Sequence, residues 1–179
     1  MARQLSIGIL QLKITLDGIE PPIWRRILVP SWISFAKLHK IIQRTMGWKD
    51  CHQHSFASDG RGELKPSAEK TVLLGHLIKK EGEVWRYQYD FGDGWDHTIT
   101  VEKTLEPDDP KKYPVCLEGA RACPPEDCGG VPGYEETLEI IADPKHPDHA
   151  DRIEWLGGGF DPEKFDLAAL NRRLKRFRL

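Results

Sequence analysis

VWRYQYDFGDGWDHTITV, residues 84–101, is the stretch that decides the fold. Large apolar side chains alternate with polar ones on both sides of a Gly-Asp-Gly segment, a pattern typical of two antiparallel strands joined by a tight turn. The alternating positions are Trp85, Tyr87, Tyr89 and Phe91 in the first run and Trp95, His97, Ile99 and Val101 in the second. Because residues two apart on a strand share a face, we expect these side chains on one face of a hairpin and largely buried.

Two further strands and a helix are predicted before this hairpin. Hydrophobic alternation predicts a strand over residues 7–16, with a one-residue slip near Leu10, and an antiparallel partner over residues 23–29. Prolines on both sides of the second run suggest that its ends sit at a sheet edge. Ser34 is a suitable N-cap for a helix over residues 35–46, which Gly47 would end.

The C-terminal half is predicted to be loop and helix. The chain is loop-like from Pro107 to Gly133, a helix and then a short helix over residues 150–156 follow, and Asp161-Pro162 signals the start of the last helix. Strands followed by helices indicate an α+β fold, a mostly antiparallel sheet with helices packed on one face. We expect a single domain over residues 1–179.

Composition narrows the class of protein. The 179 residues are 39% hydrophobic, which is typical of a globular chain, and no apolar run approaches the roughly 18 residues that cross a bilayer. The N-terminus lacks the apolar region of a signal peptide, so we expect a cytoplasmic protein without membrane contact. The four cysteines are too few for a secreted disulfide scaffold, and we interpret them as reduced thiols or metal ligands.

Charge is unevenly distributed along the chain. Residues 90–166 hold 20 acidic and 7 basic side chains, although the whole chain carries a net charge of only −2. The two regions either neutralise each other across the fold or leave a basic surface for nucleic acid. The helix near the C-terminus carries the basic side chains that we expect at such a surface: Arg172, Arg173, Lys175 and Arg176, supported by Arg25, Arg26, Lys37, Lys40 and Arg44.

Three thiols form a candidate metal site. Cys116, Cys123 and Cys128 lie within 13 residues of one another, and the prolines after Cys123 can turn the chain back. His97 is the nominated fourth ligand, so the set predicts zinc bound by sulfur and nitrogen. The alternative interpretation is that the three thiols are small packing residues of a proline-rich loop, because no tight C-x-x-C spacing is present.

Carboxylates and histidines around the hairpin form a second candidate. Asp90, Asp96, His97 and Glu126 are the candidate catalytic residues, because converging carboxylates bind a divalent cation for hydrolysis. Asp93, Asp127, His52 and His54 lie near them in the sequence. The alternative is turn chemistry for the aspartates and core packing for the histidines.

Four separated segments carry a resemblance to a known family. They are FAKLHKIIQRTMGW with HQHSF after it, YQYDFGDGWDHTITVE, CPPEDCGGVPGY and FDPEKFDLAALNRRL. In this order they resemble the plasmid pRiA4b ORF-3-like family, over about residues 10–174. The resemblance implies one α+β domain and a link to plasmids and mobile elements, and it implies no particular activity.

Two functional hypotheses follow. The first is a binding or accessory module linked to plasmids or mobile elements, with nucleic acid or a protein as its partner. The second is a metal-dependent hydrolase or nuclease that uses the Asp, His and Glu side chains of the hairpin and the PPED loop. The two differ in whether Asp90, Asp96, His97 and Glu126 line one cleft.

Overall fold

The computed structural model describes residues 8–107, 109 and 112–177, in which seven strands form one sheet. The strands are β1 (Ile9–Leu16), β2 (Ile23–Pro30), β3 (His54–Ser58), β4 (Gly62–Glu63), β5 (Val84–Tyr89), β6 (Trp95–Leu105) and β7 (Val115–Ala120). The helices are α1 (Phe35–Met46), α2 (Leu74–Leu77), α3 (Gly130–Ala142), α4 (His149–Trp155) and α5 (Leu167–Leu174), with a 3₁₀ turn at Pro66–Ala68.

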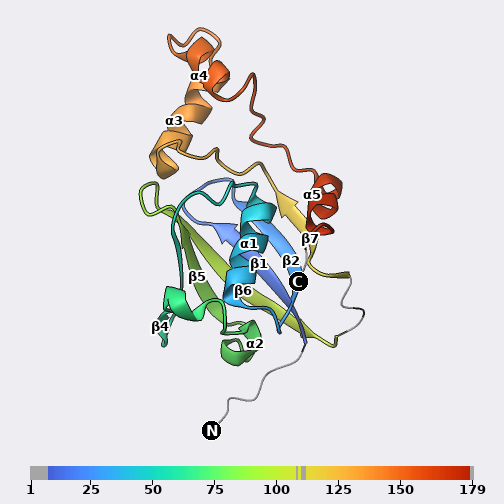
Figure 1. Ribbon diagram of the computed structural model, residues 1–179. Helices are drawn as coiled ribbons and strands as arrows, with labels where there is room; N and C mark the ends of the chain where they lie inside the picture. The colour runs from blue at the N-terminus through green and yellow to red at the C-terminus, as the bar shows by residue number, and fades with distance from the viewer. Residues whose placement is uncertain (1–7, 108, 110–111, 178–179) are drawn as a thin grey trace.

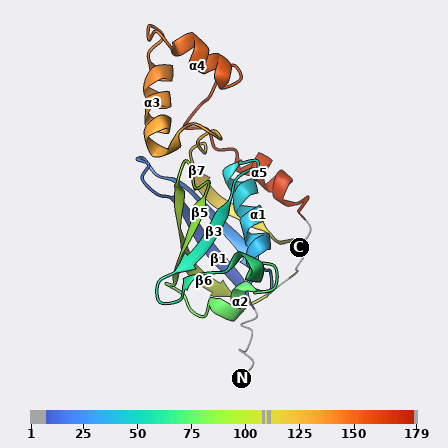
Figure 2. The same ribbon diagram turned by 60° about the vertical axis from the view of Figure 1, so that its left-hand side comes forward.

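The sheet is open and antiparallel throughout, in the order β4-β3-β5-β6-β1-β2-β7. Helices α1 and α5 lie on the same side of it (Figure 2). Alternate residues of β1 and β2 are fully buried towards these helices, whereas the residues between them are only partly covered. This is the pattern of an antiparallel sheet with one face in the core, so the predicted α+β class is confirmed.

The hairpin of β5 and β6 is confirmed. Tyr89 is opposite Trp95 and Trp85 is opposite Ile99, and all four side chains are buried. Phe91 is a correction, because β5 ends at Tyr89 and the Phe91 side chain is 51% exposed in the turn. Beyond the end of a strand the two-residue alternation no longer decides which way a side chain points.

The first two strands and α1 also agree with the expected pattern. The register between β1 and β6 shifts between Gln11 and Leu12, close to the predicted slip, whereas residue 7 lies outside the described residues. Ser34 Oγ accepts a hydrogen bond from Lys37 N, and Gly47 ends α1 with φ of +105°. β2 lies inside the sheet, where β7 pairs with residues 24–28, and its end residues Ile23, Val29 and Pro30 have no partner in β7.

Two predictions about the C-terminal half are wrong. Residues 115–120 were expected to be loop but form the edge strand β7, which α5 covers. The Asn171 side chain accepts from Cys116 N and donates to Cys116 O, at 2.8 Å each, and thereby holds the helix against this strand. Asp161-Pro162 forms a turn, and α5 begins later, with Asp166 Oδ1 accepting from Ala169 N as its cap.

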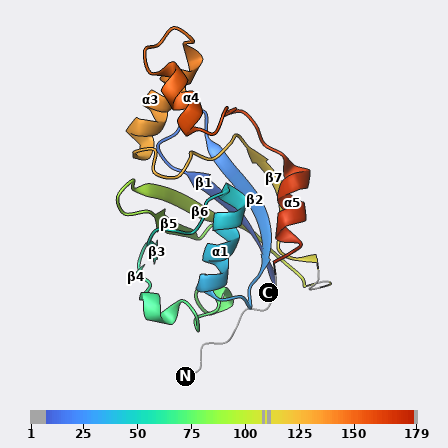
Figure 3. The same cartoon turned by 45° about the horizontal axis from the view of Figure 1, so that its top comes forward.

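Helices α3 and α4 pack on each other beyond one end of the sheet (Figures 1 and 3). The loop that leads into α3 passes the turn of the β5-β6 hairpin, where Gly129 N donates to Asp93 Oδ2. None of the helices in the described part of the chain has the length and apolar character needed to cross a membrane.

Candidate functional site

The site begins at the turn of the β5-β6 hairpin, where Asp90 follows the last residue of β5. Asp90 adopts φ of +56°, and its N–H donates to Gln53 O. Its Oδ1 accepts from Gly92 N at 2.9 Å, which is ordinary turn chemistry. The second oxygen, Oδ2, points towards His52, with 3.5 Å between it and His52 Nε2. One oxygen of this buried carboxylate is thus structural, and the other faces a neighbouring segment.

Hydrogen bonds fasten the PPED loop, residues 124–127, and the following Gly129 beside this turn. Trp48 Nε1 donates to Pro124 O, and Lys49 N donates to Glu126 Oε1 at 2.6 Å. The Tyr89 hydroxyl also donates to Glu126 Oε1, at 3.1 Å. Gly129 N donates to Asp93 Oδ2 at 3.1 Å. The loop position is therefore set by α1, β5 and the hairpin turn together.

Gly130 shows how closely this loop approaches the hairpin. Its φ is +69°, and a Cβ atom added there would lie 2.4 Å from Asp93 O, which is backbone and has little freedom to move. A side chain at residue 130 would therefore push the loop away from the turn. The glycine permits the contact that brings Asp127 and Glu126 towards Asp90.

His52 is the centre on which these carboxylates converge. Its Nε2 lies 3.1 Å from Asp127 Oδ1, 3.5 Å from Asp90 Oδ2 and 3.8 Å from Glu126 Oε2. The same nitrogen is shielded from solvent and makes no hydrogen bond within the described residues, because even the 3.1 Å approach lacks hydrogen-bond geometry. The three oxygens approach Nε2 without an N–H···O line to any of them, and Glu126 belongs to a different group of ligand atoms from Asp90 and Asp127.

Cys51 adds a thiol to the same group. The candidate ligand atoms of Cys51, His52 and Glu126 all lie within 4.8 Å of one another, as do those of His52, Asp90 and Asp127. We call these five residues the His52 cluster. The two overlapping sets share only the imidazole, so His52 is the residue on which both depend.

Tyr89 holds one carboxylate of the cluster in place. Burial raises the pKa of its phenol, and the neighbouring Glu126 acts in the same direction, against a hydrogen bond from Cys51 N. The hydroxyl therefore remains protonated near neutral pH and donates to Glu126. The bond orients the Glu126 carboxylate, with Oε2 on the side of His52.

Asp90 and Glu126 of the predicted catalytic set therefore both approach His52, in two different groups of ligand atoms, whereas Asp96 and His97 lie elsewhere. Asp96 is exposed on the opposite face of β6. His97 is 1% exposed inside the core, where its ring packs edge-on against Trp48 at 5.2 Å. Its Nδ1 lies 3.1 Å from Tyr87 O, which can only accept, so Nδ1 carries the proton.

His97 predicts a pH dependence of stability. Burial lowers its pKa from 6.5 to about 4, against the hydrogen bond to Tyr87 O. Between these pH values the unfolded chain binds a proton at this imidazole and the folded chain does not, so stability falls as the pH decreases from 6.5 to 4. The full effect is about 3 kcal/mol. The pKa of His39 is likewise lowered to about 4, chiefly by burial.

Urea unfolding of wild type and His97→Phe between pH 4 and 7 measures this effect. The slope of unfolding free energy against pH should decrease by about half in the variant, because His39 still contributes. An unchanged slope would show that His97 is accessible to protons in the folded state.

The predicted thiol site is not brought together. Cys116 lies in β7 and its Sγ donates to Glu118 O at 3.3 Å, while Cys123 and Cys128 lie on the loop that follows. The groups of metal-binding atoms within 4.8 Å of one another, among the residues with described positions, include none of these thiols and not His97. Strand pairing fixes Cys116 next to Ile27, and the core holds His97 away from the loop.

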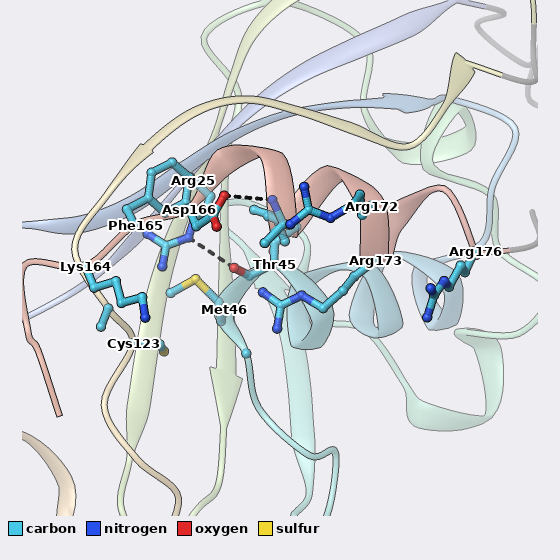
Figure 4. A pocket seen from close by; sticks show the side chains of 14 residues that line it. Arg25, Thr45, Met46, Cys123, Lys164, Phe165, Asp166, Arg172, Arg173 and Arg176 are labelled. Carbon is cyan, nitrogen blue, oxygen red and sulfur yellow. Dashed lines mark hydrogen bonds between the residues drawn. The ribbon is translucent and has the colours of Figure 1, made fainter. Parts of the chain in front are cut away.

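Three of the predicted nucleic-acid-binding side chains line a cavity of about 610 Å³. They are Arg172 and Arg173 of α5 and Arg176 just after its end, and Arg25 and Lys164 join them (Figure 4). Lys175 is not part of its lining. Of the supporting residues, Arg26 pairs with Glu102 on the other face of the sheet, and Lys40 pairs with Asp50. We call this space the basic cavity.

Sequence reasoning missed two contributors. Cys51 was not assigned to a metal site, and Lys164 was not assigned to the basic surface, whereas His52 was named only behind His97. The sequence signal for His52 was its position in the Cys-His-Gln-His run. Which of its two histidines faces the carboxylates depends on where β3 begins, because His54 is already in the strand and bonds Glu69 at 2.9 Å.

Comparisons with known proteins agree on one family. A family model described as plasmid pRiA4b ORF-3-like protein matches residues 8–169. The uncharacterized protein y4hQ of Sinorhizobium fredii is 38% identical over 173 residues, which cover 92% of this chain and 87% of that protein. The crystal structure of MM3350, a protein of unknown function from Methanosarcina mazei Go1, is 39% identical, with a TM-score of 0.83 over 91% of this chain and 97% of that one.

Proposed function

The chain belongs to the plasmid pRiA4b ORF-3-like family, and from the geometry of its own residues we propose that it is a metal-dependent hydrolase with a divalent cation at the His52 cluster. The observation that carries this proposal is the environment of His52 Nε2. Three carboxylates from two segments approach this buried nitrogen to within 3.8 Å, without a hydrogen bond to any of them.

The charge of the cluster supports a cation. Asp90, Glu126 and Asp127 have His52 as their only ion-pair partner within the described parts of the chain. Three carboxylates that share one imidazole leave a negative charge uncompensated even when the imidazole is protonated. Because Asp90 and Glu126 are also nearly buried, their mutual repulsion is poorly screened, and a divalent ion would relieve it.

The ligand types favour a borderline metal. Imidazole and carboxylate suit Zn²⁺, Mn²⁺ and Fe²⁺, and the thiolate of Cys51 would favour Zn²⁺ over the harder ions. The cation would act as a Lewis acid and lower the pKa of a bound water. The residues of the chain hold and orient it, with Tyr89 fixing Glu126 and the turn amides fixing Asp90.

A cavity beside the cluster offers room for a substrate. It has a volume of about 460 Å³ and is lined by Glu126 and Asp127 on the side of the cluster. Trp48, Lys49 and Trp155 form other parts of its wall. Pockets of this size are typical of small-molecule and cofactor sites. We call this space the Trp155 cavity.

Replacing Asp90 by asparagine tests the proposal. Asparagine retains the oxygen that accepts from Gly92 N and tolerates the left-handed backbone, so the turn is kept while the charge is lost. We expect Mn²⁺ affinity, measured by isothermal titration calorimetry, to fall by at least about 10-fold. Hydrolysis of bis(4-nitrophenyl) phosphate by the Mn²⁺-loaded protein should fall with it.

Asp96→Asn is the matched control, because Asp96 is an exposed aspartate of the same hairpin that faces away from the cluster. It should bind Mn²⁺ as wild type does. Equal losses in the two variants, or no Mn²⁺ or Zn²⁺ binding by the wild type, would contradict a metal centre at this position.

The second candidate is a nucleic-acid-binding accessory module, and the basic cavity favours it. This proposal includes the expected link to plasmids and mobile elements. It also includes a cytoplasmic location, and the four free thiols support that location. Phosphate contacts release counterions, so binding of a DNA strand in EDTA should weaken steeply as salt increases. Such binding needs no metal, and the two functions can therefore be tested separately.

A further inference from the structure

We propose that the ligand is a single-stranded nucleic acid whose phosphates lie in the basic cavity and whose unpaired base stacks on Trp155 beside the His52 cluster. This inference rests on the proposed function, because it names the substrate class of that centre. It joins two cavities that the sequence did not connect, and it assigns a binding role to an exposed tryptophan.

The two cavities adjoin at the end of α1. Met46, Gly47 and Cys123 line both the basic cavity and the Trp155 cavity. Gly47 ends the helix in the left-handed region, and the chain then turns through Trp48 and Lys49 towards the PPED loop. A ligand that extends past this corner would have cationic side chains on one side and Glu126 and Asp127 on the other.

The charge of the basic cavity selects an anion. Five cationic side chains line it against one carboxylate, that of Asp166, which already caps α5. Lys164, Arg172, Arg173 and Arg176 form no ion pair with any carboxylate whose position is described. In Figure 4 the side chains of Arg173, in α5, and Arg176, just after its end, lie along the cavity. Cationic groups spaced along a helix suit several phosphates of one chain better than a single small anion.

Arg25 adds a fixed positive charge to this wall. Its guanidinium is 3% exposed and donates to four backbone carbonyls, so the cavity receives its field although its hydrogen bonds are already used. Arg25 therefore contributes to the potential of the cavity rather than to direct contacts with a ligand.

Trp155 supplies the second half of the site. It ends α4, its side chain is 50% exposed, and it forms part of the wall of the Trp155 cavity. Arg152 lies over its ring at 5.8 Å, and its guanidinium is paired with Glu136 at 3.7 Å. Aromatic rings that flank a positively charged groove are typical of proteins that bind single strands, because an unpaired base exposes both of its faces.

A duplex does not fit this arrangement. Its bases are stacked within the helix and cannot enter a concave space of about 460 Å³ without leaving the stack. The same phosphates are present in both forms, so a preference for the single strand isolates the contribution of Trp155. A protein partner that covers Trp155 is the competing occupant, and it would give no such preference.

Fluorescence anisotropy with a labelled 12-nucleotide oligothymidine, at low salt and in EDTA, tests the inference. The wild type should bind this strand about 10-fold or more tightly than a duplex of equal length. Trp155→Ala should lose about 10-fold in affinity, and Trp155→Phe should recover most of it, because phenylalanine also stacks on a base. Lys175→Ala, which removes a charge outside the basic cavity, should bind nearly as wild type does.

The salt dependence tests the other half of the site. Replacing Arg172, Arg173 and Arg176 together by alanine should lower the slope of log affinity against log salt by about 2, given about 0.7 per phosphate contact on a single strand. Equal affinity for strand and duplex, an unaffected Trp155→Ala variant, or equally tight binding of heparin would each overturn the inference.

The outcome is separable from that of the metal proposal. If the strand binds as expected in EDTA but calorimetry shows no cation at the His52 cluster, the hydrolase is excluded and the strand site stands. If the cation binds and the strand does not, the metal centre stands and the substrate class is wrong.

Discussion

Replacing Arg25 by methionine is expected to destabilise the protein by about 3–5 kcal/mol. The Arg25 guanidinium donates to the carbonyl oxygens of Trp24, Thr45, Ala120 and Arg121, at distances between 2.7 and 3.0 Å. Methionine fills the same space without donors, so these largely buried carbonyls would lose their hydrogen bonds from this side chain. An unsatisfied buried polar group costs about 1–3 kcal/mol, and these groups share one donor.

The effect is large because Arg25 joins three parts of the fold. Its partners lie in β2, at the end of α1 and at the end of β7, all of which meet at the basic cavity. Arg25→Lys should not restore stability, because a single ammonium cannot reproduce the planar fork that reaches carbonyls on several sides. We expect lysine to recover less than half of the loss.

Urea unfolding at pH 7 measures these effects, and Arg26→Met is the matched control. Arg26 is the next residue of the same strand, but it points to the open face of the sheet and pairs with Glu102 there. Because that ion pair is partly exposed, its loss should cost about 1 kcal/mol or less. Similar losses for Arg25→Met and Arg26→Met would show that the buried guanidinium does not organise this end of the molecule.

Replacing His52 by alanine is expected to weaken metal binding by at least about 100-fold. His52 belongs to both sets of ligand atoms in the cluster, so its loss leaves only oxygen ligands in one set and a thiol and one carboxylate in the other. Outer-shell partners of a ligand already contribute about 10–100-fold to metal affinity, and a ligand itself contributes at least as much. Calorimetry with Zn²⁺ and Mn²⁺ measures the loss.

Two further variants sharpen this result. Cys51→Ser should weaken Zn²⁺ binding more than Mn²⁺ binding, because only the softer ion gains from a thiolate. His149→Ala removes a histidine of α4 outside the cluster and should leave both affinities unchanged. If His149→Ala weakened binding as much as His52→Ala, the cation would be held by surface histidines and not at the cluster.

Sequence patterns predicted the central sheet and α1 because their signals are local. The two-residue alternation from Trp85 to Val101 fixes which side chains enter the core, and Ser34 and Gly47 mark the ends of α1 in the sequence itself. Each of these features depends on residues that are neighbours along the chain. Hence they can be inferred without knowledge of the tertiary structure.

The C-terminal half was harder to predict because its elements are short and depend on distant contacts. β7 has six residues, among them a glycine and a glutamate, and it exists because β2 and α5 flank it. Asp161-Pro162 has the composition of a helix start, yet α5 begins five residues later, where Asp166 also satisfies an amide of its first turn. The sequence therefore predicted a helix in this region correctly but placed its start five residues too early.

The difference between local sequence signals and distant contacts also explains which candidate site residues were predicted correctly. Asp96 and His97 were nominated because they are close to Asp90 in the sequence, but strand alternation sends one to solvent and the other into the core. Asp90 does not follow this alternation, because it lies after the end of β5 and its backbone is left-handed. Asp90 and Glu126 reach His52 only after the chain has folded over 38 and 74 residues, and no local sequence pattern indicates such contacts.

The central claim is that a divalent cation binds at His52. Crystals of the protein soaked in MnCl₂ and measured at a wavelength with strong manganese anomalous scattering test it most directly. We expect one dominant anomalous peak between His52 Nε2 and the carboxylates of Asp90 and Asp127, at about 2.0–2.3 Å from the atoms that bind it. A map with no peak there, or with its dominant peak at other carboxylates of the surface, would contradict the account.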